Sequence, residues 1–484
     1  MNNYLIKTTR TFSSLRRYAW IFTLTVAFGG LWYPRLGLLV FGVIFALTAM
    51  SLFKGRYWCG NYCAHGSLFD QILLPFSRNG QLPGILKSKI VRAIVFTWFM
   101  YNLTSKFIRV SSLWGQWMFW DRLGFVFVAS YLMVTVAGGL LGLLVTPRTW
   151  CQFCPMGTMQ LGMYRLGKFL GWTRKYDRMI SIEDTDKCHK CAKCARVCPM
   201  QLTPYTEFSQ NNQFEHDACI RCLTCVENCP AKILTLSTAV EAEQIREASE
   251  DKGYEHRRKF SAIITRITEP ANDIREYTFT YNSNAGISPL PGQFILVKIL
   301  EQPEIFRAYS ISGIGPGNEL RVAIKRVPGG YGTGIIFGTF VLDMEVELEG
   351  PMGHELLVDD GANDVLLVAG GIGITPFIPI LQELRAKGHR ATLVYGVNTE
   401  NDLAFHETLL SLSAEGSGIS YLPVLAKPQD EYYGQKGFVT DVIRNLDVAD
   451  SHVYMCGPQG MVTAVTSLLR EKGVPSERIF AESA

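Results

Sequence analysis

Cysteines are the residues of this 484-residue chain with the most specific chemical potential, and there are thirteen of them. Twelve fall into four compact groups, a distribution typical of metal ligands and not of disulfides. Two of the groups have the form C-x2-C-x2-C-x3-C followed by proline, and the other two are pairs. The longer groups are Cys188, Cys191, Cys194 and Cys198, then Cys219, Cys222, Cys225 and Cys229; the pairs are Cys59 with Cys63 and Cys151 with Cys154.

The two longer groups predict two 4Fe–4S clusters in a ferredoxin domain over residues 180–239. In such tandem motifs three close cysteines hold one cluster, and the fourth reaches across to the other. The pattern therefore assigns Cys188, Cys191, Cys194 and Cys229 to one cluster, and Cys219, Cys222, Cys225 and Cys198 to the second. Zinc is the alternative metal for clustered thiolates. Two tandem copies that both end in Cys-Pro argue against it.

The two pairs predict a third cluster at a membrane surface, because each pair follows an apolar segment and four thiolates together could bind it. Residues 18–235 resemble the membrane-bound ferredoxin subunits that accompany periplasmic nitrate reductases and nitrous-oxide regulators. This chain departs from that pattern where Ala64 replaces a proline after Cys63, and where only two residues separate Cys151 from Cys154. Free or loosely metal-binding thiols are the alternative. His65 is either a further ligand or a solvated side chain.

A second set of motifs lies in residues 258–484. Arg307 could neutralise a phosphate, Tyr309 could stack on a planar ring, and Ser310 could hydrogen-bond a ring nitrogen. The glycine-rich run 329–334 precedes an apolar segment, and glycines before a helix can hold a pyrophosphate through backbone N–H groups. An apolar strand at 365–368 then enters a second glycine-rich loop, 369–376, and a Cys-Gly-Pro sequence follows at 456–458.

In this order the motifs resemble the ferredoxin–NADP reductase family, particularly its bacterial electron-transfer branches. The resemblance implies FAD in place of FMN, with Arg307 on the flavin phosphate, Tyr309 on the isoalloxazine and Ser310 near its N5. It further implies roles for Gly332 and Thr333 at the pyrophosphate, for Gly370, Gly371, Gly373, Thr375 and Pro376 in the nicotinamide-nucleotide loop, and for Cys456, Gly457 and Pro458 beside the nicotinamide. Ser310 and Cys456 are thus the candidate catalytic residues, and no general base is required. Phe480 either stacks on the flavin or packs in the core.

The nucleotide preference follows from the residues after the strand that ends at 394–396. Family members that select NADP usually have Arg, Lys or Ser there, whereas this chain has Glu400 and Asp402. Carboxylates repel the 2′-phosphate of NADP. Lys427 is the only nearby basic residue by loop position, so the sequence favours NADH over NADPH.

Four apolar stretches predict the elements that position the cysteine pairs: residues 18–33, 36–53, 90–103 and 125–145. The first two are a little short of a transmembrane helix and predict a tight helical hairpin, and the third is weaker because Arg92 lies near its start. The fourth has 21 residues without a charge, and buried helices of a soluble core are the alternative interpretation. Basic residues around residues 7–17, 54–92 and 148 place the N-terminus, the 54–89 loop and everything after 147 in the cytoplasm. The expected location is a bacterial-type inner (cytoplasmic) membrane, crossed several times. Because no histidine lies in these stretches, no haem is expected, and a net charge of +4 does not suggest a nucleic-acid partner.

The expected architecture is multidomain. It comprises a cytoplasmic N-terminus (1–17), a four-helix membrane domain (18–155), an α+β ferredoxin domain (180–239), a linker (240–257), an FAD-binding antiparallel β-barrel (258–360) and an α/β NAD(P)-binding domain with a parallel sheet (361–484). The basic N-terminus and the apolar stretch after it predict a retained signal anchor. The predicted function is a membrane-anchored NAD(P)H oxidoreductase that passes electrons through FAD and 4Fe–4S clusters to a quinone or a partner redox protein. The alternatives are a delivery module without its own terminal substrate, and ferredoxin-driven reduction of NAD(P). The Trp114–Trp120 loop is either a quinone site or an interfacial aromatic belt.

Overall fold

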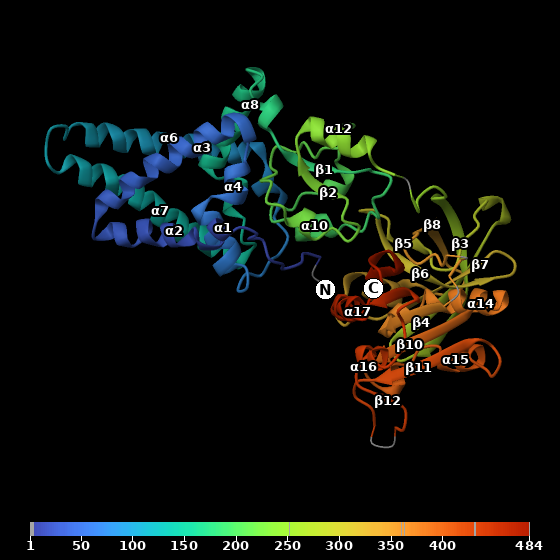
Figure 1. Ribbon diagram of the computed structural model, residues 1–484. Coiled ribbons are helices and arrows are strands. Elements are labelled where there is room, and N and C mark those ends of the chain that lie inside the picture. The colour runs from blue at the N-terminus through green and yellow to red at the C-terminus, as the bar shows by residue number, and fades with distance from the viewer. Residues whose placement is uncertain (1–3, 251, 360, 363, 430–431, 484) are drawn as a thin grey trace. The chain divides into compact units, whose positions relative to one another are not determined.

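The computed structural model describes residues 4–483 except 251, 360, 363 and 430–431. Contacts divide the chain into two compact units between Ser249 and Glu250 (Figure 1). The first unit contains the helical bundle and the ferredoxin domain. The second contains a β-barrel and an α/β domain, and each unit has hydrophobic cores of its own.

The helical bundle has four main helices, and Figure 1 shows them side by side. They are α2 (Trp20–Ala27), α3 (Leu39–Lys54), α6 (Lys89–Ser111) and α7 (Phe119–Leu144), with the shorter helices α1 (Ser14–Tyr18), α4 (Tyr57–Asn61), α5 (Ala64–Ser67), α8 (Pro155–Phe169) and α9 (Thr173–Tyr176) around them. Within the described residues, two helical segments are long and apolar enough to cross a membrane: Pro34–Lys54, which includes α3, and Phe119–Leu144. Two of the four predicted spans therefore meet this criterion.

The first predicted span is a shorter helix than expected. The α-helix α2 has eight residues, and 3-10 turns follow at Gly29–Leu31 and Pro34–Leu38. Eight residues rise only ~12 Å, far less than a hydrocarbon core. The second turn, Pro34–Leu38, packs its backbone directly on the backbone of α7, because a Cβ at Gly37 would overlap the carbonyl oxygen of Gly124.

The third predicted span lies inside α6, which has 23 residues. This helix is long enough to cross a bilayer, but Lys89, Arg92, Lys106 and Arg109 make it less apolar than α3 or α7. In the chain, α6 comes between the spanning-length helices α3 and α7, and each of those two helices is followed by a cysteine pair. Cys59 and Cys63 follow α3, Cys151 and Cys154 follow α7, and the side chains of both pairs line one cavity.

The ferredoxin domain is a small α+β fold. Its strands β1 (Met179–Ile182) and β2 (Leu234–Ser237) pair antiparallel, and the cysteine loops contain the short helices α10 (Lys193–Val197) and α11 (Thr224–Glu227). Helix α12 (Ala239–Glu247) follows within the expected linker. It begins with a capping box in which Thr238 and Glu241 satisfy each other's backbone N–H groups.

The barrel of the second unit is closed and antiparallel, which confirms the predicted antiparallel barrel. Its strands are β3 (Arg258–Ala271), β4 (Ile274–Tyr281), β5 (Phe294–Leu300), β6 (Ile305–Gly315), β7 (Glu319–Lys325) and β8 (Glu345–Met352), in the order β3-β4-β7-β6-β5-β8. One helix, α13 (Tyr331–Thr339), follows β7 directly after the first glycine-rich run.

The last domain is a parallel sheet with helices on both faces, as predicted. The strand order is β12-β11-β10-β9-β13-β14, and the strands are β9 (Asp364–Gly370), β10 (Arg390–Val397), β11 (Ile419–Leu425), β12 (Gln435–Lys436), β13 (His452–Gly457) and β14 (Ile479–Ser483). The helices are α14 (Phe377–Lys387), α15 (His406–Leu412), α16 (Val439–Arg444) and α17 (Gln459–Glu471). In β9, Leu367 packs with α14 and α15 while Leu366 and Val368 pack with α16 and α17. The sheet is therefore buried on both sides, and its carboxyl edge is where ligands bind in such folds.

Candidate functional site

The structure gathers each ferredoxin cysteine set that the sequence assigns, including the cysteine that crosses over. Cys188, Cys191, Cys194 and Cys229 line one cavity. In the other set, burial raises the pKa of the Cys225 thiol, and the nearby Cys222, Cys219 and Cys198 sulfurs raise it further. Cys194 of the first set also raises the pKa of Cys225, so the two sites are neighbours.

The two ferredoxin loops have the same backbone conformation at equivalent positions. Lys190 and Ala192 have positive φ in the first loop, as do Arg221 and Leu223 in the second. The residues three places after Cys198 and Cys229 (Gln201 and Lys232) also share this conformation. Each such non-glycine residue costs ~1–2 kcal/mol. Two loops that keep the same costly shape are built to enclose the same kind of group.

The donor chemistry fits iron–sulfur clusters. Burial raises the pKa of Cys198 to about 11 and of Cys219 to about 12, and neighbouring sulfurs add to the rise. Bare thiolates are therefore unfavourable at neutral pH, whereas coordination to a metal deprotonates a thiol outright. Backbone N–H groups also approach the sulfurs, as in the 3.4 Å contact from Lys190 N to Cys188 Sγ.

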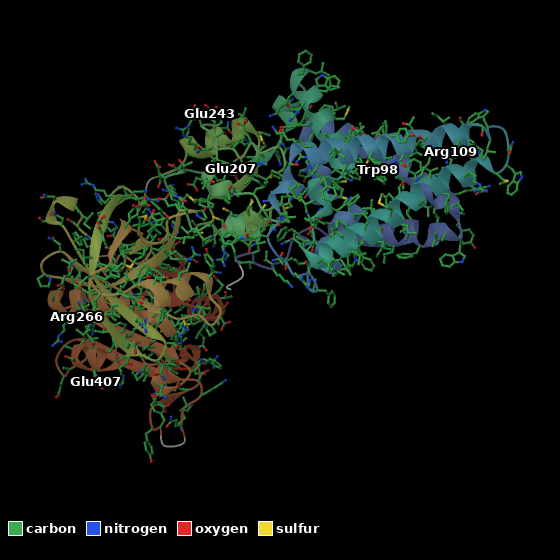
Figure 2. All side chains as sticks on the ribbon, turned by 180° about the vertical axis from the view of Figure 1, so that it is seen from behind. Trp98, Arg109, Glu207, Glu243, Arg266 and Glu407 are labelled. Carbon is green, nitrogen blue, oxygen red and sulfur yellow. The ribbon has the colours of Figure 1, made fainter. Side chains whose placement is uncertain are left out.

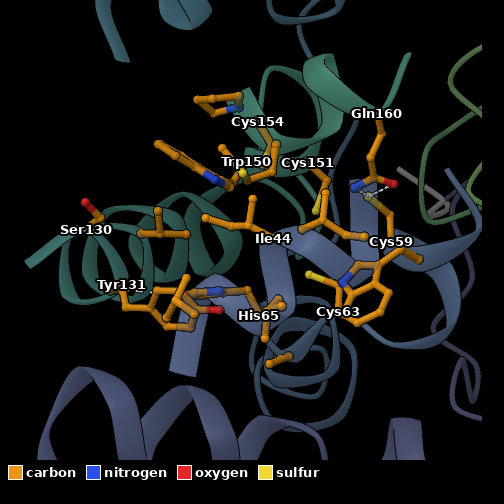
Figure 3. A pocket seen from close by; sticks show the side chains of 18 of the residues that line it. Ile44, Cys59, Cys63, His65, Ser130, Tyr131, Trp150, Cys151, Cys154 and Gln160 are labelled. Atoms are coloured by element: carbon orange, nitrogen blue, oxygen red, sulfur yellow. Dashed lines mark hydrogen bonds between the residues drawn. The ribbon is translucent and has the colours of Figure 1, made fainter. Parts of the chain in front are cut away.

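The four cysteines of the two pairs converge on a separate cavity (Figure 3). Cys63 and Cys154 occupy equivalent places, because each is the N-cap of a helix, with φ/ψ of −60°/119° and −54°/127°. Ala64 therefore occupies the helix position that Pro155 fills in the second motif. The missing proline does not change the local backbone.

The sulfurs of this four-cysteine site receive hydrogen bonds from nearby groups. Gln160 donates from Nε2 to Cys59 Sγ at 3.3 Å (Figure 3), and Gly66 N approaches Cys63 Sγ at 3.4 Å. Burial raises the pKa of Cys63 and of Cys154 to about 12. This environment, like that of the ferredoxin loops, suits metal-bound thiolates better than free thiols.

Two buried arginines join the pairs, and the sequence reasoning missed them. Arg56 Nη2 donates to the Cys151 carbonyl at 2.9 Å, and Arg148 Nη1 donates to the Cys59 carbonyl at 3.3 Å. Each arginine thus bonds to the first cysteine of the other motif. A signal was present, because Arg-x-Trp-Cys occurs at both 56–59 and 148–151.

His65 is half-buried and faces α7. Its Nε2 lies 3.4 Å from the Tyr131 carbonyl oxygen and 3.3 Å from Thr135 Oγ1, and its ring centroid is 4.6 Å from that of Tyr131. Burial lowers the pKa of His65 to about 4, so the ring is neutral. A fully solvated histidine is not observed, because the helix that starts at Ala64 turns this side chain toward α7.

The four-cysteine site lies directly against the second ferredoxin loop. A Cβ at Gly60 would overlap the carbonyl oxygen of Ile220, and Asn61 Nδ2 donates to the Arg221 carbonyl at 3.2 Å. Cys59 and Cys151 also pack against the same hydrophobic cluster as Cys219 and Cys225. The order of sites along the first unit is therefore first ferredoxin set, second ferredoxin set, four-cysteine site.

The flavin motif lies on β6, next to the start of α13. Arg307, Tyr309 and Ser310 occupy neighbouring positions on this strand, which pairs with β5. A Cβ at Gly332 would lie 2.8 Å from Arg307 Nε, so the guanidinium crosses the first turn of α13. Thr333 is in the same turn, which no side chain caps. A cation and a helix N-terminus together fit a pyrophosphate.

The nucleotide motifs meet at the carboxyl edge of the parallel sheet. Gly370 ends β9, the turn 371–374 follows, Thr375 donates to the Ile372 carbonyl, and Pro376 is the N-cap of α14. Cys456 and Gly457 end β13, and Pro458 is the N-cap of α17. A Cβ at Gly373 would overlap the Cys456 carbonyl oxygen, so only glycine allows the two loops to meet.

A cleft of about 580 Å³ lies at this edge and is lined by Gly370, Gly371, Pro458 and Asp402. Lys325, from barrel strand β7, also lines it and lies 3.8 Å from Asp402 Oδ1. Lys427 is exposed and does not line this cleft. The sequence did not point to Lys325 as the basic residue of this cleft, because Lys325 belongs to the barrel and not to the α/β domain.

Phe480 and Glu482 lie on the edge strand β14, which pairs with β13. Phe480 stacks on Tyr454 with ring centroids 4.9 Å apart, so it packs in the α/β core. Glu482 pairs in register with Cys456 across β14 and β13. Burial raises the pKa of Glu482 to about 7, and the negative charge of Glu355 acts in the same direction. A protonatable carboxyl beside Cys456 was not visible from sequence spacing.

Comparison with known proteins gives three family matches. "Oxidoreductase NAD-binding domain" matches residues 367–467, "4Fe-4S dicluster domain" matches 180–230, and "4Fe-4S binding domain" matches twice, at 36–83 and 128–173. The last two segments each contain one cysteine pair.

Among curated proteins, the toluate 1,2-dioxygenase electron transfer component of Pseudomonas putida is 29% identical over 46% of this chain and 67% of its own length. A ferredoxin–NAD(P)(+) reductase component of naphthalene 1,2-dioxygenase/salicylate 5-hydroxylase systems from Ralstonia is 30% identical over 46% and 67%. The electron transfer subunit of dihydroorotate dehydrogenase B from Shouchella clausii is 32% identical over 43% and 78%. A solved ferredoxin reductase of carbazole 1,9a-dioxygenase is 23% identical over 47% and 69%, with a TM-score of 0.42.

Proposed function

Because the C-terminal half of this chain belongs to the ferredoxin reductase family and the N-terminal half carries 4Fe–4S ferredoxin domains, we propose a membrane-anchored oxidoreductase that moves electrons from NADH to iron–sulfur clusters and then to a membrane acceptor. The observation that carries the proposal is the continuous order of cysteine sites in the first unit, joined by one polypeptide to a reductase half. NADH delivers two electrons together as a hydride, whereas each 4Fe–4S cluster accepts one electron at a time. FAD, when bound, can accept the pair and release single electrons.

The residues of the reductase half have defined tasks in this proposal. Arg307, Gly332 and Thr333 hold the FAD pyrophosphate, Tyr309 stacks on the flavin ring, and Ser310 lies at its edge. The loop of Gly370, Gly371, Gly373, Thr375 and Pro376 binds the nicotinamide nucleotide, and Cys456, Gly457 and Pro458 position the nicotinamide. Asp402 favours NADH, because its carboxylate lines the cleft and neutralises Lys325, the cation that could attract a 2′-phosphate.

The cysteines hold three clusters in this proposal. Cys188, Cys191, Cys194 and Cys229 hold the first, Cys219, Cys222, Cys225 and Cys198 the second, and Cys59, Cys63, Cys151 and Cys154 the third. The third assignment is supported by the shared cavity, the equivalent N-cap positions of Cys63 and Cys154, and the two family matches over the cysteine pairs.

We further infer that the helical bundle lies in the bacterial inner membrane, with the redox domains in the cytoplasm. Trp98, midway along α6 (Figure 2), is 57% exposed, and Phe45 of α3 is 78% exposed. Large apolar side chains exposed along several neighbouring helices are characteristic of a lipid-facing or partner-facing surface. The two spanning-length segments anchor the bundle, and α2 and α6 pack against α7.

A quinone is the acceptor that the cavity favours. The cavity of the four-cysteine site extends between α3, α6 and α7 and is lined mainly by apolar side chains, including Ile44, Phe99 and Phe127. Trp150 lines it too, and within the described residues its buried Nε1 has no hydrogen-bond partner. An apolar slot with an unused N–H donor suits a quinone carbonyl. The Trp114–Trp120 loop does not suit this role, because it lies at the other end of α7, ~39 Å of helix away.

A partner redox protein is the second candidate acceptor, because the relatives named above are components of multi-protein systems. An assay of NADH oxidation by the purified protein with a short-chain quinone analogue distinguishes a quinone acceptor from a partner redox protein. Turnover supports the quinone, and turnover only after a partner is added supports the delivery module. Quantification of iron, sulfide and flavin after anaerobic purification tests the cofactor set. About twelve irons and one FAD per chain are expected, whereas about eight irons would remove the third cluster.

A further inference from the structure

The four-cysteine site is surrounded by more buried positive charge than its acidic neighbours can neutralise. Arg148 is 0% exposed and Arg56 is 3% exposed. Arg148 pairs with the buried carboxylate of Asp70 at 2.7 Å, but Asp70 is shared with Arg16 and with Arg10, which is 3.6 Å away. One carboxylate therefore serves three guanidinium groups.

The positive charge of Arg56 is neutralised even less than that of Arg148. No carboxylate lies within 4.0 Å of it among the described residues, and its buried Nε has no hydrogen-bond partner there. With Arg10, Arg16 and Arg148, it leaves an excess of three positive charges over Asp70. A buried charge without a partner costs several kcal/mol, so this arrangement indicates an anion at the site.

The geometry connects this charge to the cysteines. Arg148 Nη1 is 3.5 Å from Cys151 Sγ, and the two reciprocal bonds to the Cys59 and Cys151 carbonyls hold both guanidiniums across the site. Glycines make room for them. A Cβ at Gly66 would lie 2.6 Å from Arg148 Nη1, and one at Gly157 would lie 3.0 Å from Arg56 Nη2.

Four thiolates around a 4Fe–4S core carry a net charge of about −2 when oxidised and −3 after one electron is added. Nearby positive charge stabilises the more negative form. We propose that Arg56 and Arg148 form a reciprocal clamp that supplies the countercharge of an anionic cluster at Cys59, Cys63, Cys151 and Cys154 and sets its reduction potential. Asp70 limits that charge. This inference rests on the proposed third cluster.

The test is an EPR-monitored redox titration of the full-length protein, with iron content measured on the same samples. Arg56→Gln should lower the midpoint potential of one cluster by at least 59 mV, a tenfold change in a one-electron equilibrium constant. Arg56→Lys keeps the positive charge but loses the planar guanidinium with its paired N–H donors, so it should shift the midpoint potential less. Asp70→Asn should raise the same potential. Arg35→Gln is the control, because this arginine is exposed and pairs with Asp121 in the turn region far from the cysteines.

A clamp that only ties the two motifs together would lower iron content without moving the potential of the cluster that remains. The proposal is overturned if Arg56→Gln keeps its iron with unchanged potentials, or if Arg56→Gln and Arg56→Lys shift them equally. Where Arg56→Gln loses the third cluster, Asp70→Asn decides: a raised potential supports the clamp and an unchanged one overturns it. Wild-type protein with about eight irons would instead refute the third cluster itself.

Discussion

Gly60 and Ile220 are in backbone contact across the boundary between the helical bundle and the ferredoxin domain. Gly60 follows Cys59, and Ile220 lies between Cys219 and Cys222, so the contact brings two cysteine motifs together. Electron transfer between sites depends steeply on their separation. In the proposed electron path, the position of Gly60 therefore sets the distance from the ferredoxin domain to the four-cysteine site.

Gly60→Ala should separate these motifs, because the added methyl would overlap the Ile220 carbonyl oxygen. A cost of ~1–3 kcal/mol is expected from such overpacking. In stopped-flow experiments with NADH, reduction of the last cluster should slow at least tenfold while flavin reduction keeps its rate. Gly42→Ala is the control, since a Cβ there meets nothing within 4 Å. Equal rates in the two variants would contradict this account.

Arg307→Gln should weaken FAD binding by ~10–100-fold, because charge-assisted hydrogen bonds contribute ~1.5–3 kcal/mol. Flavin content after gel filtration, and titration of the apoprotein with FAD, measure the effect. Arg266→Gln, on an exposed position of β3, should leave FAD affinity unchanged. Full flavin retention in Arg307→Gln would remove this residue from the site.

Asp402→Asn should move the nucleotide preference toward NADPH. The change removes one carboxylate from the cleft and frees Lys325 to meet the 2′-phosphate. We expect the ratio of kcat/KM for NADPH over NADH to rise at least fivefold, mostly through KM for NADPH. Asp364→Asn is a suitable control, because this aspartate lies at the opposite end of β9 and pairs with Arg390. A ratio that stays constant would mean that another group selects the nucleotide.

Glu482→Gln should change how stability depends on pH. Because burial raises the pKa of Glu482 to about 7, the folded form holds its proton more tightly than the unfolded chain does. The stabilisation is complete below the unfolded pKa near 4.5 and is lost as pH rises to about 7. Relative to Glu482→Gln, wild type should lose up to ~3 kcal/mol across that window and show no further change above it.

Thermal release of FAD, followed by fluorescence between pH 4.5 and 8, measures this difference. Glu477→Gln, at an exposed position, should keep the wild-type slope. Parallel curves for wild type and Glu482→Gln would show that this carboxyl has an ordinary pKa.

The sequence predicted which ferredoxin cysteines lie together, because cluster ligands follow a local spacing. The crossover of Cys198 and Cys229 followed from the tandem motif alone, and the barrel and the parallel sheet followed from motif order. The helical bundle was harder to predict. Hydropathy alone did not reveal that the segment before Pro34 breaks at Gly29–Gly30 and packs on α7, since that contact joins Gly30 to Val128, almost a hundred positions later.

Residues that act between motifs were the ones missed. Arg56 and Arg148 bond across the four-cysteine site, Lys325 enters the nucleotide cleft from the barrel, and Glu482 meets Cys456 only through strand pairing. In each case the partner is distant in sequence. Spacing rules describe ligands within one loop and carry no information about such pairs.

The most direct test of the account is an anaerobic titration of the purified protein with NADH, followed by optical and EPR spectroscopy on the same samples. The account predicts that flavin absorbance falls and that reduced iron–sulfur signals rise with it, one electron per cluster. A flavin that is fully reduced by NADH while every iron centre keeps its oxidation state would contradict it.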